Sequence, residues 1–568
     1  MFGSMTEPTL PLALSISLDG LDENVRKCIV ELLNIIDRQG TELKRLRDEN
    51  ARQREEIAKL KGQRPAKPEA DPPQDPAAGG PNKGGKNRSS EKERHEPKPR
   101  QNHRQPLQAD THQRLCMEPS QLPPDAQFKG CETTIVQDLV LRRNNIAFER
   151  EKYYSAQQGK TFLAPLPPEY QGYEYGPGVR SLVLVLYYAC GVTEPKLQAL
   201  LVSLGIQISS GQVSNLVTQK LDVFHEEKAE VLDAGLASSP WQHMDDTGTS
   251  MAGAPWHCHA VCNPLYTFFS TRPSKDRATV IDVLRNGRPS FFRVSAWVLE
   301  QLEQQGVGLK WRQALAAIPP ELEMNEEHLR AALASYGEPG PSVWAAIADV
   351  CRVQGYRAST DGPVAKLLLT DGASTFATVT EEHGMCWVHD GRLYKQLTST
   401  VEVFVQEVER FLDLYWDFYR QLLAYKGAPT AQRAEELRVK FDEVFSTPTM
   451  CAKLRNRIAR TREKKGELLL VLKHPEIPLH NNEAELAERD RARKRDVSLA
   501  AQSERGLRAW DTMQSVLATA KKLGVGVVQY VEDRVRGLGQ IPRLASLIAA
   551  KAAQLRLGLS WELPLLTA

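Results

Sequence analysis

A heptad pattern of apolar residues near the N-terminus is the feature that most restricts how this chain can fold. From Val25 onward, apolar residues recur at alternating intervals of four and three, with polar residues in only three slots of the stripe. This spacing is typical of a coiled coil, because it keeps one seam of the helix facing a partner helix. The apolar members are Val25, Ile29, Leu32, Ile36, Leu43, Leu46, Ile57 and Leu60.

The register of the stripe indicates how many helices would join and in which direction. With Val25 at heptad position d, position a holds isoleucine or leucine except for a single asparagine, Asn50. One asparagine at an a position favours a parallel two-stranded register. We therefore predict a parallel coiled coil over 20–62 that joins copies of the chain through residues 25–60, as a homodimer or within a higher oligomer. The alternative is a single helix packed on the protein's own core.

The next stretch is not expected to fold. Residues 63–125 begin with a long run of Pro, Gly and charged residues that has almost no apolar side chains. Such a composition cannot bury enough apolar surface to offset the lost chain entropy, so we predict a disordered linker over 63–125. It would act either as a mildly basic tether touching a polyanion or as a plain solvated spacer. The whole chain has 73 Lys and Arg against 71 Asp and Glu, which identifies no partner.

A small β region followed by a pair of helices is predicted over 126–235. Short runs of β-branched and aromatic residues between Lys129 and Thr161 predict a few small strands. Farther on, Thr193 can cap a helix that Gly205 ends, and Ser210 can cap a second helix. The pair fits a helix-turn-helix that reads DNA, although other helix pairs share the pattern. The candidate base-reading side chains are Gln212, Ser214, Asn215 and Thr218.

Cysteine usage and hydropathy suggest where the protein works. Nine cysteines occur without a repeated spacing, which favours reduced thiols over a disulfide framework. The longest apolar run is far shorter than the roughly 20 residues that a membrane span needs. We expect a soluble, cytoplasmic protein with no membrane partner.

Two predicted strands end in aspartate within an α/β region that starts near residue 236. The strand over 241–244 is followed by Asp245 and Asp246, and the buried strand over 366–370 is followed by Asp371. Successive side chains on a strand point to opposite faces, so only one of the two adjacent aspartates can face a shared site. We choose Asp245.

A third acid, Glu485, is predicted in the first turns of a helix that Asn481 or Asn482 can cap. Three converging carboxylates could hold two divalent ions, because Mg²⁺ takes one or two carboxylates together with phosphate oxygens and water. Two ions about 4 Å apart promote in-line phosphoryl displacement, the chemistry of nucleases and strand-transfer enzymes. Spacing alone is weak support, since surface carboxylates are plentiful.

Longer phrases carry a more specific resemblance. WQHMDDTGT, CNPLYTFFSTRPSKDRATVIDVL, LLLTDGASTF, MCWVHDGRLYKQL, LHNNEAELAERDRARKR and LRAWDTMQSVLATAKKLGVGVVQYVEDRV occur in this order. In these phrases the chain resembles transposases of the insertion-sequence sixty-six family, over roughly 130–535. The resemblance implies an RNase H-like DDE catalytic domain, which we expect over 236–535. Helical insertions are expected over 296–353, after a third strand near Phe291, and over 398–473, and a helical tail over 536–568.

The resemblance also implies an activity and the residues that carry it. Such enzymes cleave DNA at transposon ends and join the ends to target DNA. Asp245, Asp371 and Glu485 match the catalytic acids that hold two Mg²⁺ ions, for which Mn²⁺ would substitute. Transposon ends and target DNA are the implied partners, and accessory proteins of the same element are further candidates.

Several basic residues beside these acids are candidate DNA contacts. His389 and Arg392 belong to a phrase that matches a family motif, and either phosphate contact or a structural role would explain His389. A run of cations follows the glutamate, and beside a phosphodiester site we interpret it as phosphate-binding rather than a solvated face. Its members are Arg489, Arg491, Arg493, Lys494 and Arg495.

The chain departs from the family pattern at two points. Many relatives carry a Cys-rich zinc module after the linker, whereas this chain has only Cys116 and Cys131 there, so we predict no zinc finger. Close relatives tend to have a second aspartate where this chain has Gly372. Gly372 leaves open a DNA-binding assembly protein of the same fold that no longer cuts. A general two-metal nuclease also stays open, since it would share the three acids, although it would leave the helix-turn-helix and the coiled coil unexplained.

Overall fold

The computed structural model describes residues 21–60, 109–123, 126–498 and 501–562. The chain divides into two compact units. The first unit combines Met1–Glu49 with Ile146–Ala568, and the second unit is Asn50–Asn145. Regular structure described in the second unit consists of the end of helix α1 (Glu23–Leu60) and the 3₁₀ turn η1 (Pro119–Gln121). Most of the linker predicted over 63–125 lies outside the described residues.

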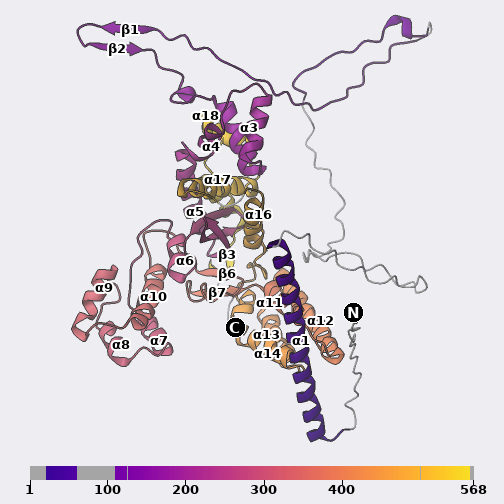
Figure 1. Cartoon of the computed structure of the whole chain (residues 1–568), viewed down its shortest axis with the longest axis vertical. Helices are drawn as coiled ribbons and strands as arrows, with labels where there is room; N and C mark the ends of the chain where they lie inside the picture. The colour runs from indigo at the N-terminus through magenta and orange to yellow at the C-terminus, as the bar shows by residue number, and fades with distance from the viewer. Residues whose placement is uncertain (1–20, 61–108, 124–125, 499–500, 563–568) are drawn as a thin grey trace, which may run out of the picture. The chain divides into compact units, whose positions relative to one another are not determined.

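The first unit is built around a five-stranded mixed sheet (Figure 1). Its strands are β3 (Trp241–Met251), β4 (Ala254–Asn263), β5 (Tyr266–Arg272), β6 (Leu367–Thr370) and β7 (Glu382–Met385). The order is β5-β4-β3-β6-β7, in which β3, β4 and β5 are antiparallel, while β6 lies parallel to β3 and β7 parallel to β6. This mixed α/β arrangement is compatible with an RNase H-like domain.

Two strand predictions need correction. Strand β3 runs on to Met251, because it pairs with β4 over most of its length, so Asp245 lies inside the strand and not at its end. Near Phe291 the described backbone forms an isolated bridge between Phe292 and Met324, and the third strand of the sheet is β5.

Helix side chains cover the edge strand β5 and satisfy its backbone donors. Three alternate N–H groups of β5 donate to side-chain oxygens of α17 (Glu504–Lys522) at 2.7–3.2 Å. Four helical residues rise about 6 Å, close to the roughly 6.7 Å between alternate strand residues, so acceptors four residues apart match the donors. The donors are Thr267, Phe269 and Thr271, and the acceptors are Thr519, Ser515 and Asp511. An exposed edge is thereby removed.

Other helices complete the covering of the sheet. Helix α16 (Asn482–Ser498) packs on β3 and β4, and α5 (Asp222–Ala237) packs on β5. The predicted C-terminal tail contains α19 (Leu544–Leu555), which packs on α5, and α20 (Leu559–Glu562). The same unit also contains α6 (Arg277–Leu284), α11 (Trp387–Lys395), which packs on the second insertion, and α18 (Val527–Arg536), which packs on α17.

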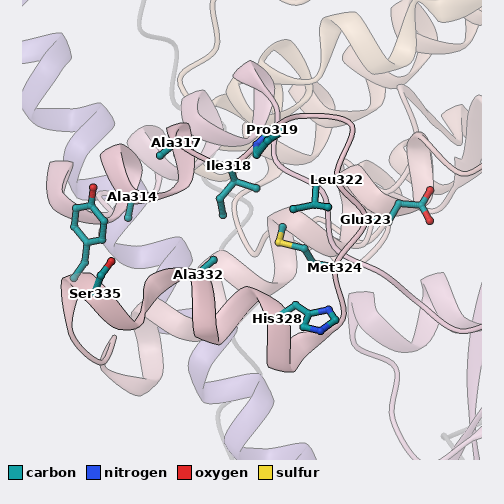
Figure 2. Close-up of a pocket in the computed structure, with 11 residues that line it drawn as sticks. Ala314, Ala317, Ile318, Pro319, Leu322, Glu323, Met324, His328, Ala332 and Ser335 are labelled. Carbon is teal, nitrogen blue, oxygen red and sulfur yellow. The ribbon is translucent and has the colours of Figure 1, made fainter.

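The first helical insertion has a core of its own. It consists of α7 (Ala296–Gln304), α8 (Leu309–Ala316), α9 (Glu326–Leu333), η4 (Ala334–Tyr336) and α10 (Pro341–Arg357). A pocket of about 510 Å³ lies between α8, α9 and their connecting loop. It is lined mainly by apolar side chains such as Ile318 and Leu322 (Figure 2). Neither the candidate acids nor the candidate DNA contacts line it.

The second insertion shares its core with the sheet. It consists of α12 (Glu402–Gly427), α13 (Ala431–Val444), α14 (Ala452–Glu463), α15 (Lys465–Leu468) and η5 (Leu470–Leu472). The apolar stripe of α12 is buried and packs in one cluster with Trp241 and Trp387. The apolar residues of α12 recur with helical spacing because one face of the helix packs in this core.

Helix α1 presents two different faces. Leu33 is buried in the core of the second insertion, and the fully covered Asp37 forms an ion pair with Lys453 at 2.8 Å. Of the predicted a/d seam, Ile29 packs against the same core, whereas Leu32 and Ile36 keep 57% and 43% of their surface exposed. Thus part of the helix packs on the protein's own core, while other seam residues remain open to solvent.

The region that precedes the sheet begins with two short strands. Within the described residues, 129–161 contributes to a single hairpin, β1 (Lys152–Ser155) with β2 (Lys160–Leu163), followed by η2 (Pro168–Tyr170). Next come α2 (Pro177–Leu184), the π-helical turn η3 (Val185–Ala189), α3 (Glu194–Ser203) and α4 (Ser210–Thr218). The cap of α4 is Ser209 instead of Ser210, because Ser209 and Gln212 form a capping box.

None of the helices in the described ranges combines the length and the apolar character needed to cross a membrane.

A candidate active site on the central strands

Two aspartates lie side by side where β3 and β6 meet. The parallel register pairs His243 with Leu369, so two residues farther along, Asp245 comes beside Asp371, which directly follows β6. Neighbouring strands keep paired side chains on the same face. Asp245 accepts a hydrogen bond from the N–H of Asp246 at 2.9 Å, and Asp371 accepts one from the N–H of Ala373 at 2.9 Å. These local bonds hold both carboxylates near the backbone.

Helix α16 brings the third acid to this face. Burial, the charges of Asp371 and Glu485, and the smaller contribution of Asp246 raise the pKa of Asp245 to about 7. Repulsion of this kind falls off with distance, so it indicates that the acids from β3, β6 and α16 form one electrostatic cluster.

A cation already partners the glutamate. The guanidinium of Arg392, on α11, approaches both carboxylate oxygens of Glu485 at 2.9 and 3.1 Å. A bidentate pair of this kind is among the stronger side-chain interactions. Two residues before Glu485, Glu483 pairs with Lys522 at 2.6 Å. Among the described residues, no three His, Cys, Asp or Glu side chains stand in an arrangement that would hold a metal ion.

The neighbour of Asp245 has different surroundings. Asp246 pairs in the β3–β4 register with His259, and its carboxylate lies 3.7 Å from the ammonium of Lys275. Since successive strand residues point to opposite faces, Asp246 and Asp245 face different sides of the sheet. This favours Asp245 as the member of the acid cluster.

The glycine that follows Asp371 has a conformational role. Gly372 adopts φ +94°, a region that L side chains rarely enter, and an added Cβ would lie 2.5 Å from the Met385 side chain. Glycine is therefore the residue that this turn accommodates without strain.

The predicted DNA contacts fall into groups with different surroundings. Arg491 is buried, and its guanidinium lies 3.6 Å from the Trp510 ring centre, which argues against direct contact with DNA. Lys494 is half-buried over the Tyr187 ring, and the pKa of its ammonium falls to about 8 because of burial.

The other basic candidates are more accessible. Arg489 and Arg493 are exposed, and Arg493 pairs with Asp490 at 3.2 Å. Arg495 is half-buried and donates to the Gly248 carbonyl. The N–H of the half-buried His389 donates to the Cys386 thiol at 3.3 Å.

The four polar candidates on α4 differ in solvent exposure and in the hydrogen bonds that their side chains already form. Gln212 caps the helix and donates to the Glu174 carboxylate at 2.9 and 3.0 Å. Asn215 is exposed and accepts from Gln219 at 2.5 Å. The half-buried Thr218 donates to the carbonyl of the half-buried Ser214 at 2.7 Å. Asn215 is thus the most accessible of the four candidates.

Sequence reasoning missed a buried acid one turn beyond Glu485. Glu488 is 5% exposed, and neither of its carboxylate oxygens has a hydrogen-bond partner within the described parts of the chain. Burial and then repulsion by Asp245 raise its pKa well above the usual glutamate value. The spacing of three residues from Glu485, which places both on one helix face, was the available signal.

Comparisons with known proteins identify the family of this chain. The family model described as "Transposase IS66 family" matches residues 356–509, a range that includes Asp371 and Glu485. A protein of Sinorhizobium fredii, named "Uncharacterized protein y4jO", is 32% identical over 343 residues, which cover 57% of this chain and 100% of that protein. The chain therefore belongs to the IS66 family of transposases.

Proposed function

We propose that this chain is a DNA transposase that binds the ends of its insertion sequence and catalyses their cleavage and transfer to target DNA. One observation carries the proposal: the β3–β6 register brings Asp245 beside Asp371 on the face where Glu485 raises the pKa of Asp245. Family membership supports the transposase class, and the acid cluster supports a phosphodiester reaction within it.

The donor set fits divalent metal ions. Asp245, Asp371 and Glu485 offer only carboxylate oxygens, the ligands that Mg²⁺ prefers. Two Mg²⁺ ions, or Mn²⁺ in their place, would activate the attacking oxygen and stabilise the leaving one. The mutual repulsion of the acids favours cation uptake, since a bound cation relieves it.

The protein's own residues contribute charge and position. Arg392 pairs with both carboxylate oxygens of Glu485, and the same guanidinium can pair with a phosphate oxygen when Glu485 takes another partner. The N–H of His389 is held by Cys386 at the start of α11, which orients this helix beside the acids. The exposed Arg489 and Arg493 add positive charge suited to a DNA backbone.

Helices α3 and α4 are the proposed DNA-reading element. They form two packed helices with a capped start on α4, as in a helix-turn-helix. The exposed Asn215 is the best-placed side chain for a base edge, whereas Gln212 is already engaged by its cap and by Glu174. Base-edge contacts specify sequence, while phosphate contacts position the protein.

The proposed partner of α1 is a second copy of the chain. Seam residues such as Leu32 and Ile36 are exposed although a neighbouring face is buried on the second insertion. A parallel pairing through 25–60 would cover this apolar surface without displacing the contacts of Leu33 and Asp37.

Cleavage of DNA carrying the inverted repeats that flank the gene tests the proposal. Asp371→Asn and Glu485→Gln keep side-chain shape and remove one charge, so we expect at least about 10²-fold slower cleavage and joining, with end binding retained. Asp246→Asn is the matched control and should cleave nearly as well as the parent protein. Full activity of both Asp371→Asn and Glu485→Gln would refute the two-metal site.

A further inference from the structure

A buried asparagine connects the catalytic helix to the central strand. Asn481 is fully covered and directly precedes α16, where its carbonyl accepts from the N–H of Glu485 at 3.1 Å. Its side-chain Nδ2 donates to the carbonyl of Met244 at 3.0 Å, and its Oδ1 lies 2.9 Å from Nδ1 of His243. His243 and Met244 are the two residues before Asp245 in β3.

These contacts allow only one orientation of the amide. A backbone carbonyl can only accept, so Nδ2 of Asn481 must face Met244, and Oδ1 must face His243. The histidine proton is therefore on Nδ1, and the Nε2 of His243, also buried, has no hydrogen-bond partner among the described residues. One short side chain thus connects segments 237 and 238 positions apart in the sequence.

The backbone of the same residue is connected to the residue before Asp371. The N–H of Asn481 donates to the thiol of Cys386 at 3.2 Å. The N–H of Cys386 donates in turn to the carbonyl of Thr370 at 2.9 Å, and Thr370 directly precedes Asp371. The side chain of Asn481 therefore bonds to the two residues before Asp245, while its backbone bonds to the backbone of Glu485 and, through Cys386, to the residue before Asp371.

We propose that Asn481 is the positioning residue that sets the spacing of Asp245, Asp371 and Glu485. This inference rests on the proposed transposase function and goes beyond it, because it assigns the geometry of the cluster to a residue that touches no substrate. Catalytic groups must be held within about 0.5 Å of their working positions by supporting hydrogen bonds. Loss of such outer support typically weakens metal binding 10- to 100-fold.

Two variants and one control test the proposal in the full-length chain. Asn481→Ala removes both side-chain bonds, and His243→Phe removes one of them while keeping an aromatic ring in the same buried place. Asn263→Ala is the matched control, since Asn263 is equally covered but its side chain bonds to Gly235, Ser238 and Leu265 and to none of the segments that carry the acids. Amide exchange of residues 482–490, Mn²⁺ binding, end binding and cleavage are measured for each.

We expect Asn481→Ala to speed exchange at 482–490 at least about tenfold without metal and to weaken Mn²⁺ binding 10- to 100-fold. End binding should stay within about twofold, because these residues touch no DNA. His243→Phe should act in the same direction, and the double variant should lose no more than Asn481→Ala alone, since the bonds act as one unit. Asn263→Ala should change neither exchange at 482–490 nor Mn²⁺ binding.

Unchanged exchange and Mn²⁺ affinity in Asn481→Ala would overturn the assignment, and so would equal losses in Asn263→Ala. If Asn481→Ala does not fold, amide exchange and Mn²⁺ affinity of His243→Phe test the assignment instead, and unchanged values of both would overturn it. If the parent protein cleaves no end-bearing DNA, the transposase proposal fails, while exchange and Mn²⁺ binding still decide whether Asn481 positions the acids.

Discussion

Replacing Asp245 by asparagine should stabilise the metal-free protein at alkaline pH. The carboxyl of Asp245 is largely buried beside Asp371 and Glu485, and its pKa rises from 3.8 to about 7. Each pKa unit corresponds to 1.36 kcal/mol, so ionised Asp245 weakens the folded state by about 4 kcal/mol. Asparagine has the same shape as aspartate but no charge to bury, so the variant does not lose this stability at high pH.

The pH dependence has a definite sign. The folded state holds the Asp245 proton up to a higher pH than the unfolded state does, so between pH 4 and 7 the folded state binds more protons. Stability of the parent protein therefore falls as pH rises through this window, by up to about 1.4 kcal/mol per pH unit from this group. The free energies of unfolding of the variant and the parent should be equal near pH 4, and at pH 8 that of the variant should be higher by about 4 kcal/mol.

Urea unfolding in EDTA, followed through the fluorescence of tryptophans such as the buried Trp241, measures the difference. Asp246→Asn is the control, and it should keep the parent slope because it leaves Asp245 in place. Adding Mn²⁺ at pH 8 should stabilise the parent and leave Asp245→Asn nearly unchanged. Parallel stability curves of parent and Asp245→Asn from pH 4 to 8 would refute the coupled acid cluster.

Three further predictions concern other parts of the molecule. Glu488→Gln should leave the free energy of unfolding unchanged near pH 4 and raise it by about 1–3 kcal/mol at pH 8, as urea unfolding at both pH values can measure. The reason is that ionising this buried carboxyl, which has no hydrogen-bond partner among the described residues, is unfavourable. Ile36→Lys should convert the dimer to monomer in sedimentation experiments, and a monomeric parent would contradict the coiled coil. Asn215→Ala should weaken binding to the cognate end by about 1–3 kcal/mol in competition gel shifts and spare random duplexes, whereas Gln212→Ala would also lose the cap of α4.

Local periodicity in the sequence predicted individual elements well. The apolar spacing along 404–422 predicted a packed helix, and these side chains are buried in α12. The strand before Asp371 and the helix around Glu485 were also predicted, because such patterns depend on side chains within one or two turns. The ordered phrases that resemble IS66 transposases supplied the family, which the matching family model confirms.

The tertiary structure decided which residues surround the acids. The side-chain partners of Asn481 lie more than 230 positions away, and the burial of Arg491 depends on Trp510 from another helix. The extension of β3 past Asp245 likewise depends on pairing with β4, and the second face of α1 depends on an insertion that begins near residue 398. Contacts between distant segments leave no period in the sequence, since each partner satisfies its local pattern whether or not the other is present.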